Sequence, residues 1–173
     1  MAEINQTITT LHNLLDFDAR RFISAEIQLK KSLQEWINKT DSVKLKTVLQ
    51  KYLDFVNQHV QKIENFLEEE KISSLSLSNR VMQAFIEEAD EKLSNCTDAE
   101  VKDACLVACI QAINHYKISS YGTAAAFAIA LGMEKAATVF HEAEINEKHI
   151  DDRLSQLAEY EVNTKAKTPI LLP

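Results

Sequence analysis

The sequence contains few of the residues that interrupt helices. Its 173 residues include only two glycines and two prolines, at positions 122, 132, 169 and 173. Folds rich in strands and turns normally need more of both, because glycine and proline supply the backbone angles of tight turns. Hydrophobic residues make up 46% and charged residues 26%, which is typical of a globular protein. Length and composition together predict one helical domain with its own core.

Other absences exclude several classes of function. The net charge of −7 leaves no basic excess for binding nucleic acid. No apolar run approaches the ~20 residues that cross a bilayer, and no signal-peptide pattern is visible, so we expect no membrane partner and a cytoplasmic location. No phosphate-binding loop, nucleophile elbow or zinc-finger spacing is present, so no catalytic residue is assigned. Of the three cysteines, Cys105 and Cys109 share an apolar helical face, which favours buried thiols over a bridge.

Apolar residues spaced three and four positions apart predict four long helices and one short helix. Their expected ranges are about 3–38, 41–70, 79–94, 99–130 and 134–162. Thr40 or Asp41 is the expected cap of the second helix. The helix over 99–130 is apolar on most of its surface, which indicates a central position in the fold.

The connection between the second and third long helices predicts how the helices are arranged. It contains the short helix, so the chain can cross over the end of the bundle instead of turning back tightly. A long crossover in the middle of four helices is typical of a ferritin-like four-helix up-down bundle. The expected domain covers residues 1–163, followed by a flexible tail over 164–173 that ends in ILLP.

Acidic and histidine side chains occur at positions that the helical stripes place in the core. They are Glu26, His59, His115, Glu144, Glu147 and Asp151. Glu26 shows the pattern, because it follows Phe22 by four residues and precedes Leu29 by three. Buried carboxylates are costly unless they meet cations, and di-iron and di-manganese bundles meet that cost with Glu and Glu-x-x-His sets. The alternative is that these side chains lie at stripe edges and reach solvent.

Three segments of the chain carry a family pattern. SAEIQL (24–29), NHYKISSYGT (114–123) and EKHIDDRLSQLA (147–158) are similar to SAEKQL, EHYEIASYGT and EKATDxKLTxLA. These are segments of the YciF/YciE-type stress proteins, a ferritin-like family without assigned activity, which the chain resembles from roughly residue 11 to residue 158. The resemblance implies a four-helix bundle with a small extra helix, a dimeric assembly and a di-metal centre of carboxylates and histidine.

The resemblance also implies that this di-metal site is degenerate. Residues that match the family pattern are Glu26, His115, Glu147 and Asp151. Residues that stand where the family has an acid are Arg21, Phe55, Asn114, Lys117 and Asn146. Two divalent ions need about four to six anionic or imidazole ligands, so these replacements weaken the site. Lys117 is a candidate cation surrogate, because its ammonium can balance the carboxylates that remain.

Three functions are consistent with these patterns. We expect a stress-associated ferritin-like protein with a degenerate di-metal site and a structural or partner-binding role, without a cofactor and without enzymatic activity. The alternative is a di-iron or di-manganese protein that handles oxygen or peroxide, with metal ligands Glu26, His59, Glu144, Glu147 and Asp151. The third is a helical module that docks another protein through an exposed stripe or its tail. The resemblance implies that the partner includes a second copy of the chain, as a homodimer.

Overall fold

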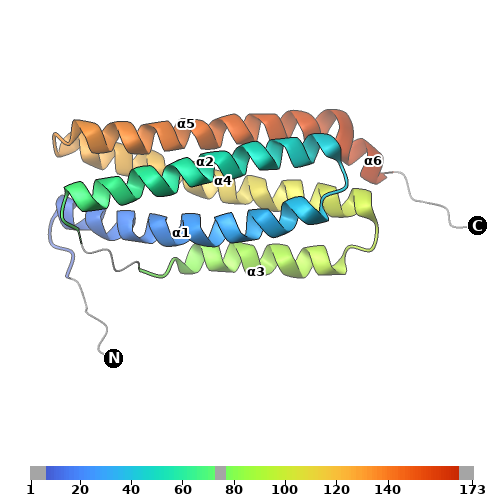
Figure 1. Ribbon diagram of the computed structural model, residues 1–173, viewed down its shortest axis with the longest axis horizontal. Coiled ribbons are helices and arrows are strands. Elements are labelled where there is room, and N and C mark those ends of the chain that lie inside the picture. Colours follow the sequence, from blue (N-terminus) through green and yellow to red (C-terminus); the bar gives the residue numbers. More distant parts are fainter. Residues whose placement is uncertain (1–6, 73–76, 168–173) are drawn as a thin grey trace, which may run out of the picture.

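The computed structural model describes residues 7–72 and 77–167, and helices make up most of them (Figure 1). In chain order these are α1 (Leu11–Lys39), α2 (Val43–Glu69), α3 (Arg80–Asn95), α4 (Ala99–Ala130), α5 (Glu134–Leu157), the π-helical turn η1 (Ala158–Val162) and α6 (Asn163–Lys167). These two ranges contain no strand. The predicted all-α bundle, with four long helices and one short helix in the crossover, is confirmed.

The four long helices form a closed ring of neighbours. α1 packs against α2, α2 against α5, α5 against α4, and α4 against α1. The crossover helix α3 lies outside this ring, beside α1 and α4 (Figure 1). α2 and α4 therefore stand diagonally across the bundle, which is why the chain needs a long connection between them.

Side-chain caps determine where the helices begin, and two expected starts are wrong. α1 begins after Thr10, whose side chain accepts a hydrogen bond from the N–H of Asn13, and residues 7–10 are not helical. α2 begins after Ser42, which accepts from the N–H of Leu45, and not after Thr40 or Asp41. The reason lies outside the helix. The carboxylate of Asp103 on α4 accepts from the N–H groups of Asp41 and Ser42, at 3.1 and 2.7 Å, and holds this connection in an extended form.

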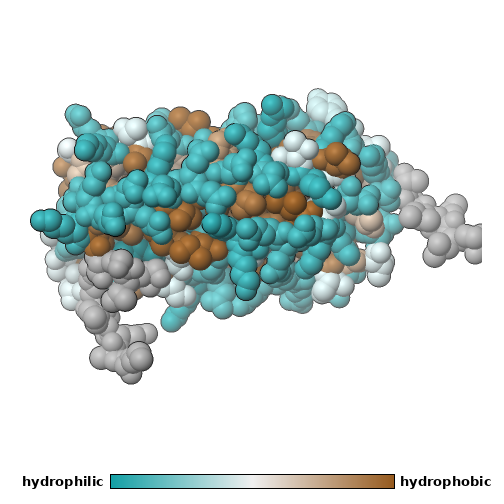
Figure 2. All heavy atoms as spheres, in the orientation of Figure 1, coloured by the Kyte–Doolittle hydropathy of each residue, from teal (hydrophilic) through white to brown (hydrophobic). Residues whose placement is uncertain are grey.

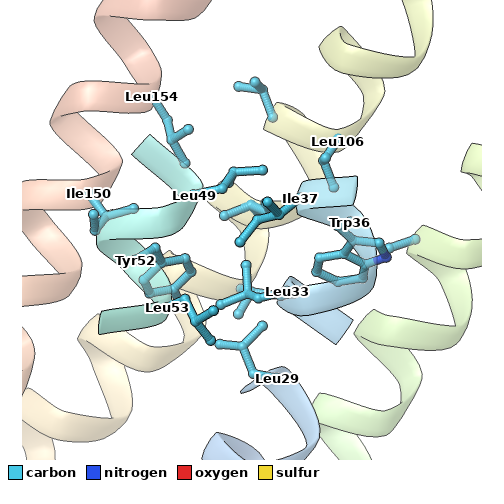
Figure 3. Close-up of a cluster of buried hydrophobic side chains, with 14 of the residues drawn as sticks. Leu29, Leu33, Trp36, Ile37, Leu49, Tyr52, Leu53, Leu106, Ile150 and Leu154 are labelled. Atoms are coloured by element: carbon cyan, nitrogen blue, oxygen red, sulfur yellow. The ribbon is translucent and has the colours of Figure 1, made fainter. Parts of the chain in front are cut away.

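A large apolar cluster fills the half of the bundle at the α1–α2 turn. Figure 3 shows Leu29, Leu33, Trp36, Ile37, Leu49, Leu53, Leu106, Ile150 and Leu154 converging there from α1, α2, α4 and α5. Trp36 is fully buried, and its ring N–H donates a 2.9 Å hydrogen bond to Asp90 on α3. This bond satisfies the polar atom of the indole and attaches the crossover helix to the bundle. A second cluster occupies the other half, around Phe22, Ile63, Tyr121 and Phe140.

One face of α4 is exposed, which corrects the expectation that this helix is central on all sides. Ala108, Ala112 and His115 are exposed, and the Ile129 side chain is 70% accessible. Their neighbours on the helix surface are mainly alanines and serines, which pattern analysis cannot separate from core residues. Hydrophilic residues predominate on the face of the molecule in Figure 2, where apolar residues form separate patches. Across 7–72 and 77–167, no helix has the length and hydropathy to cross a bilayer.

The C-terminal part of the chain changes helix type before the described region ends. α5 continues into the π-helical turn η1 and then into α6, which ends at Lys167. Residues 164–167, expected to be tail, thus belong to a short helix. The remainder of the expected tail, 168–173 with its ILLP tip, lies outside the described residues. In η1, Glu161 pairs with Lys44 at 2.5 Å and with Lys165 at 3.1 Å.

Candidate functional site

A layer of ionisable side chains divides the core into its two apolar halves. Each helix of the ring contributes one member, namely Glu26 from α1, His59 from α2, Lys117 from α4 and Glu147 from α5. All four are buried, with at most 2% of each residue accessible. Each follows a residue of one cluster and precedes a residue of the other along its own stripe, as Glu26 does between Phe22 and Leu29. Helical periodicity therefore brings these four side chains to the same level of the bundle.

The ammonium of Lys117 is the centre of this layer. Its Nζ atom lies 2.9 Å from Oε1 and 3.0 Å from Oε2 of Glu26. The same atom lies 2.5 Å from Oε1 of Glu147. It is also 5.0 Å from the ring centroid of Tyr52 and 5.8 Å from that of Tyr121, within the range of cation–π attraction. One cation therefore connects α4 to α1 and α5 through both carboxylates.

Neutral donors supply further hydrogen bonds to the two carboxylates. Oε2 of Glu147 accepts from the hydroxyl of Tyr52 and from the amide of Asn114, each at 2.7 Å. Oε1 of Glu26 accepts from the hydroxyl of Tyr121. The two tyrosines were not predicted as site residues, because an aromatic residue on an apolar stripe is typical of a core. Only the surplus of acids near their positions could have indicated a role for their hydroxyls.

His59 faces both carboxylates from the α2 side. Its Nδ1 atom lies 3.3 Å from Oε1 of Glu26 and 3.7 Å from Oε1 of Glu147, without a well-directed hydrogen bond to either. Its Nε2 atom lies 3.2 Å from Nδ2 of Asn146. With this amide donating, Nε2 is the acceptor and the ring proton is on Nδ1, directed at the carboxylates. The Nδ1–H group of His59 thus places a second, weaker positive charge density next to the two carboxylates.

The charges in the layer stabilise one another. Burial, the largest influence, would lower the pKa of Lys117, but Glu147 and Glu26 outweigh it and raise the pKa above its ordinary value. Burial would likewise raise the pKa of Glu26, but Lys117, followed by His59, lowers it to about 2. Burial, together with the carboxylates, raises the pKa values of the Tyr52 and Tyr121 hydroxyls, which therefore remain neutral donors. At neutral pH this is a buried cluster of one ammonium and two carboxylates with hydrogen-bond partners.

Two predicted ligands on α5 are not part of the layer. Glu144 is partly exposed, where it pairs with Lys148 at 2.5 Å and with His141 at 3.4 Å. Asp151 is also partly exposed, and His115 and Gln111 contact it at 3.1 Å each. The expectation that three consecutive acids of the last helix face the core is thus correct for Glu147 alone. His115, expected on a core stripe, lies on the exposed face of α4, with 68% of its side chain accessible.

Part of the layer has the composition of a metal site. Glu26, His59 and Glu147 each offer a ligand atom, and these atoms lie within 4.8 Å of one another, so this cluster could hold a metal ion. The ammonium of Lys117 contacts the same carboxylates, however, and a divalent ion there would meet a like charge at close range. A pair of ions would need more anionic ligands than two carboxylates and one imidazole. The residues present do not fit a di-metal centre.

Solved structures of related proteins share this architecture. The chain superposes on the crystal structure of the stress protein YciF from Escherichia coli with a TM-score of 0.84 and 31% identity, covering 93% of this chain and all of that one. For YcfI from Rhodopseudomonas palustris the TM-score is 0.83 with 25% identity, covering 90% and 98% of the two chains. A two-domain protein from Anabaena variabilis with DJ-1/ThiJ/PfpI-like and ferritin-like domains has a TM-score of 0.59 at 15% identity. That likeness, which covers 95% of this chain and 40% of the other, shows the fold alone.

Sequence similarity leads to the same group of proteins. The chain is 36% identical to Protein YciF of Escherichia coli (strain K12) over 145 residues, which cover 83% of this chain and 87% of that protein. Residues 10–167 match the family described as Domain of unknown function (DUF892), which is most of the chain. With its five principal helices, its crossover and its polar layer in place, the chain belongs to the DUF892 family of YciF-type ferritin-like proteins.

Proposed function

We propose that this protein is a stress-associated ferritin-like bundle in which the ammonium of Lys117 takes the place of a metal. Its role is structural or partner-binding, and the layer stabilises the bundle without performing chemistry. The observation that carries this proposal is the contact of one ammonium with both buried carboxylates, at 2.5 to 3.0 Å. An ammonium offers neither a redox change nor an open coordination position. The association with stress is taken from the printed description of the similar E. coli protein.

Charge balance supports this proposal. Glu26 and Glu147 carry two negative charges inside the core, and Lys117 supplies one positive charge next to both. The remaining charge is met by the hydroxyls of Tyr52 and Tyr121, which donate to carboxylate oxygens, and by the His59 ring, whose Nδ1 atom lies 3.3 Å from Glu26. Each carboxylate then has partners without any added ion, as a buried charge requires.

Metal analysis tests the proposal directly. The full chain would be purified without chelator, incubated with ferrous iron or manganese under anaerobic conditions, desalted and analysed for metal content. We expect no stoichiometric metal in the wild-type protein. The matched variant is Lys117→Ala, which leaves Glu26, His59 and Glu147 free and should retain one ion per chain. Stoichiometric metal in the wild type, lost on Glu26→Gln, would contradict the proposal.

A single-metal site is the second candidate, and the mutual proximity of Glu26, His59 and Glu147 favours it. It requires the Lys117 ammonium to leave the carboxylates when the ion arrives. The two candidates differ in their effect on stability, because only the second predicts that manganese or ferrous iron raises the melting temperature of the wild-type protein. An unchanged melting temperature with saturating metal would exclude the single-metal site.

We further propose that the protein is a homodimer in the cytoplasm. The dimer is expected from the family resemblance, and the exposed face of α4, with Ala108, Ala112 and Ile129, is one surface where packing against another chain would cost little polar desolvation. Light scattering coupled to gel filtration measures the mass directly. A monomeric mass at micromolar concentration would rule out the dimer while leaving the role of Lys117 untouched.

A further inference from the structure

All three cysteines lie where α3 meets α4, away from the polar layer. Cys96 is the residue at the C-terminal end of α3, where its thiol contacts the carbonyl oxygen of Lys92 at 3.3 Å. Cys105 and Cys109 lie on α4 and pack at the edge of the larger apolar cluster. All three thiols are free and partly exposed. Cys105 and Cys109 are therefore unbridged, as expected, but they are not fully buried, because α3 covers only part of the α4 face that carries these two residues.

The three thiols lie around the last turns of α3. The thiol of Cys96 is 3.3 Å from the carbonyl oxygen of Lys92, and Lys92 lines a surface pocket together with Cys105 and Cys109. Burial raises the pKa of all three thiols, and Cys96 and Cys105 are close enough to influence each other's pKa. Reagents that enter the pocket can therefore reach Cys105.

Helix geometry decides which pair of these thiols can form a disulfide. Cys105 and Cys109 are four residues apart on one helix, where Cβ atoms are about 5 to 6 Å apart and Cα–Cβ bonds are parallel. A disulfide needs a Cβ separation of about 3.5 to 4.5 Å. A bridge within α4 would distort the helix. Cys96 belongs to a different helix and follows its last turn, with extended backbone, so it can adjust toward Cys105.

We propose that Cys96 and Cys105 form a reversible disulfide with small disulfide oxidants such as oxidised glutathione. One thiol loses its proton to solvent, and its thiolate attacks a sulfur of the oxidant, which forms a mixed disulfide and releases one glutathione thiolate. The second protein thiol loses its proton and attacks the protein sulfur of that mixed disulfide. The Cys96–Cys105 bond forms and a second glutathione leaves. Two protein thiols are oxidised, and one disulfide is reduced to two thiols.

The bridge would fasten the crossover helix to the bundle. It closes a ring over residues 96–105, which includes the connection between α3 and α4 and the first turns of α4. Cross-linking a ring of this size removes conformational entropy from the unfolded chain, and we expect the melting temperature to rise by about 5 to 10 °C. Reduction should reverse the change completely. The device is independent of Lys117, so it can be tested whether or not the core binds metal.

The experiment uses the full chain, reduced and freed of reductant, then exposed to oxidised glutathione. We expect a product lighter by two hydrogens, in which peptide mapping links Cys96 to Cys105 while Cys109 stays open to alkylation. Cys109→Ser should give the same bridge and the same rise in melting temperature. Cys96→Ser and Cys105→Ser should give neither, and should carry glutathione on the remaining thiols instead. A bridge between Cys105 and Cys109, a disulfide between two chains, or glutathione adducts alone in the wild type would overturn the proposal.

Discussion

The Nζ atom of Lys117 lies 2.9 and 3.0 Å from the two carboxylate oxygens of Glu26. This contact joins α4 to α1, two helices that are far apart in the sequence. Both side chains are buried, so water does not weaken the attraction between them. Because the same ammonium also contacts Glu147, the pair is part of a three-residue ionic unit. This unit lies between the two apolar clusters, so substitutions in it should change the free energy of unfolding.

Removing the ammonium should destabilise the fold strongly. We expect Lys117→Met to lower the free energy of unfolding by about 3 kcal/mol, because it leaves Glu26 and Glu147 buried without their cation. Urea denaturation at neutral pH followed by circular dichroism measures the change. The control is Lys148→Met, which removes an exposed lysine paired with Glu144 and should change stability by less than about 0.5 kcal/mol. Equal effects of the two substitutions would show that the buried position has no special role.

Removing all three charges together should cost less than removing the cation alone. In the variant Glu26→Gln, Glu147→Gln, Lys117→Met, the glutamines can still accept from Tyr121 and Tyr52, and no charge is left without a partner. We expect this triple variant to be about 2 kcal/mol more stable than Lys117→Met. The measurement is again urea denaturation. A triple variant less stable than the single one would mean that Lys117 acts by packing and not by charge.

Acid should remove the contribution of Glu26. Its pKa is lowered to about 2 in the folded protein from an ordinary value of 4.5. A group with a lowered pKa stabilises the fold above its unfolded pKa and loses that contribution as pH falls through its folded pKa. We therefore expect unfolding free energy to fall between pH 4.5 and about 2, by about 3 kcal/mol from this group.

The variant Glu26→Gln isolates this contribution, because glutamine does not titrate. Its unfolding free energy should be lower than that of the wild type at pH 6, and the difference should shrink as pH approaches 2. Urea denaturation at several pH values gives both curves. Parallel curves over this range would show that Glu26 does not titrate with the predicted shift.

At the alkaline end, the raised pKa of Lys117 predicts a contribution to stability that is present below pH 10.5 and lost above it.

Restoring acids to α4 should create a metal requirement. The family pattern has acids at positions 114 and 117, and both side chains here lie next to Glu147. We expect Asn114→Glu with Lys117→Glu to be strongly destabilised alone and to be stabilised by manganese or ferrous iron, since four carboxylates and His59 then lie together in the core. Calorimetry with and without metal measures this. The control is Lys148→Glu with Gln34→Glu, which adds the same charge at exposed positions and should show no metal dependence.

The sequence predicted the bundle well because its signals were redundant. Stripes and scarce turn residues indicated the same helices, and the long crossover indicated their order. The site residues were harder to predict, because core positions were assigned from apolar residues spaced three and four apart. On a helix with 3.6 residues per turn, Glu144 and Asp151 both lie about 40 to 60° to the same side of Glu147. That side faces solvent beside α4, and a stripe cannot show where the core ends.

The exposed face of α4 was not predictable for a related reason. A helix that is apolar nearly all round has no preferred side, so its pattern carries no information on which neighbours cover it. Ala108 and Ala112 look like core residues in the sequence and are exposed in the structure. The pairing of Lys117 with Glu26 needed information from across the bundle, since these residues are 91 positions apart. Only the family pattern, with its acid at position 117, pointed to it.

The ammonium of Lys117 is attached covalently to the chain, whereas a metal ion has to be taken up from the cell. A bound metal ion has to be acquired, can be exchanged for a competing one, and is lost when chelators lower its free concentration. The ammonium of Lys117 is synthesised with α4, and its effective concentration at the two carboxylates is set by the fold itself. The positive charge beside Glu26 and Glu147 is therefore present as soon as the chain folds, and a shortage of iron or manganese does not remove it.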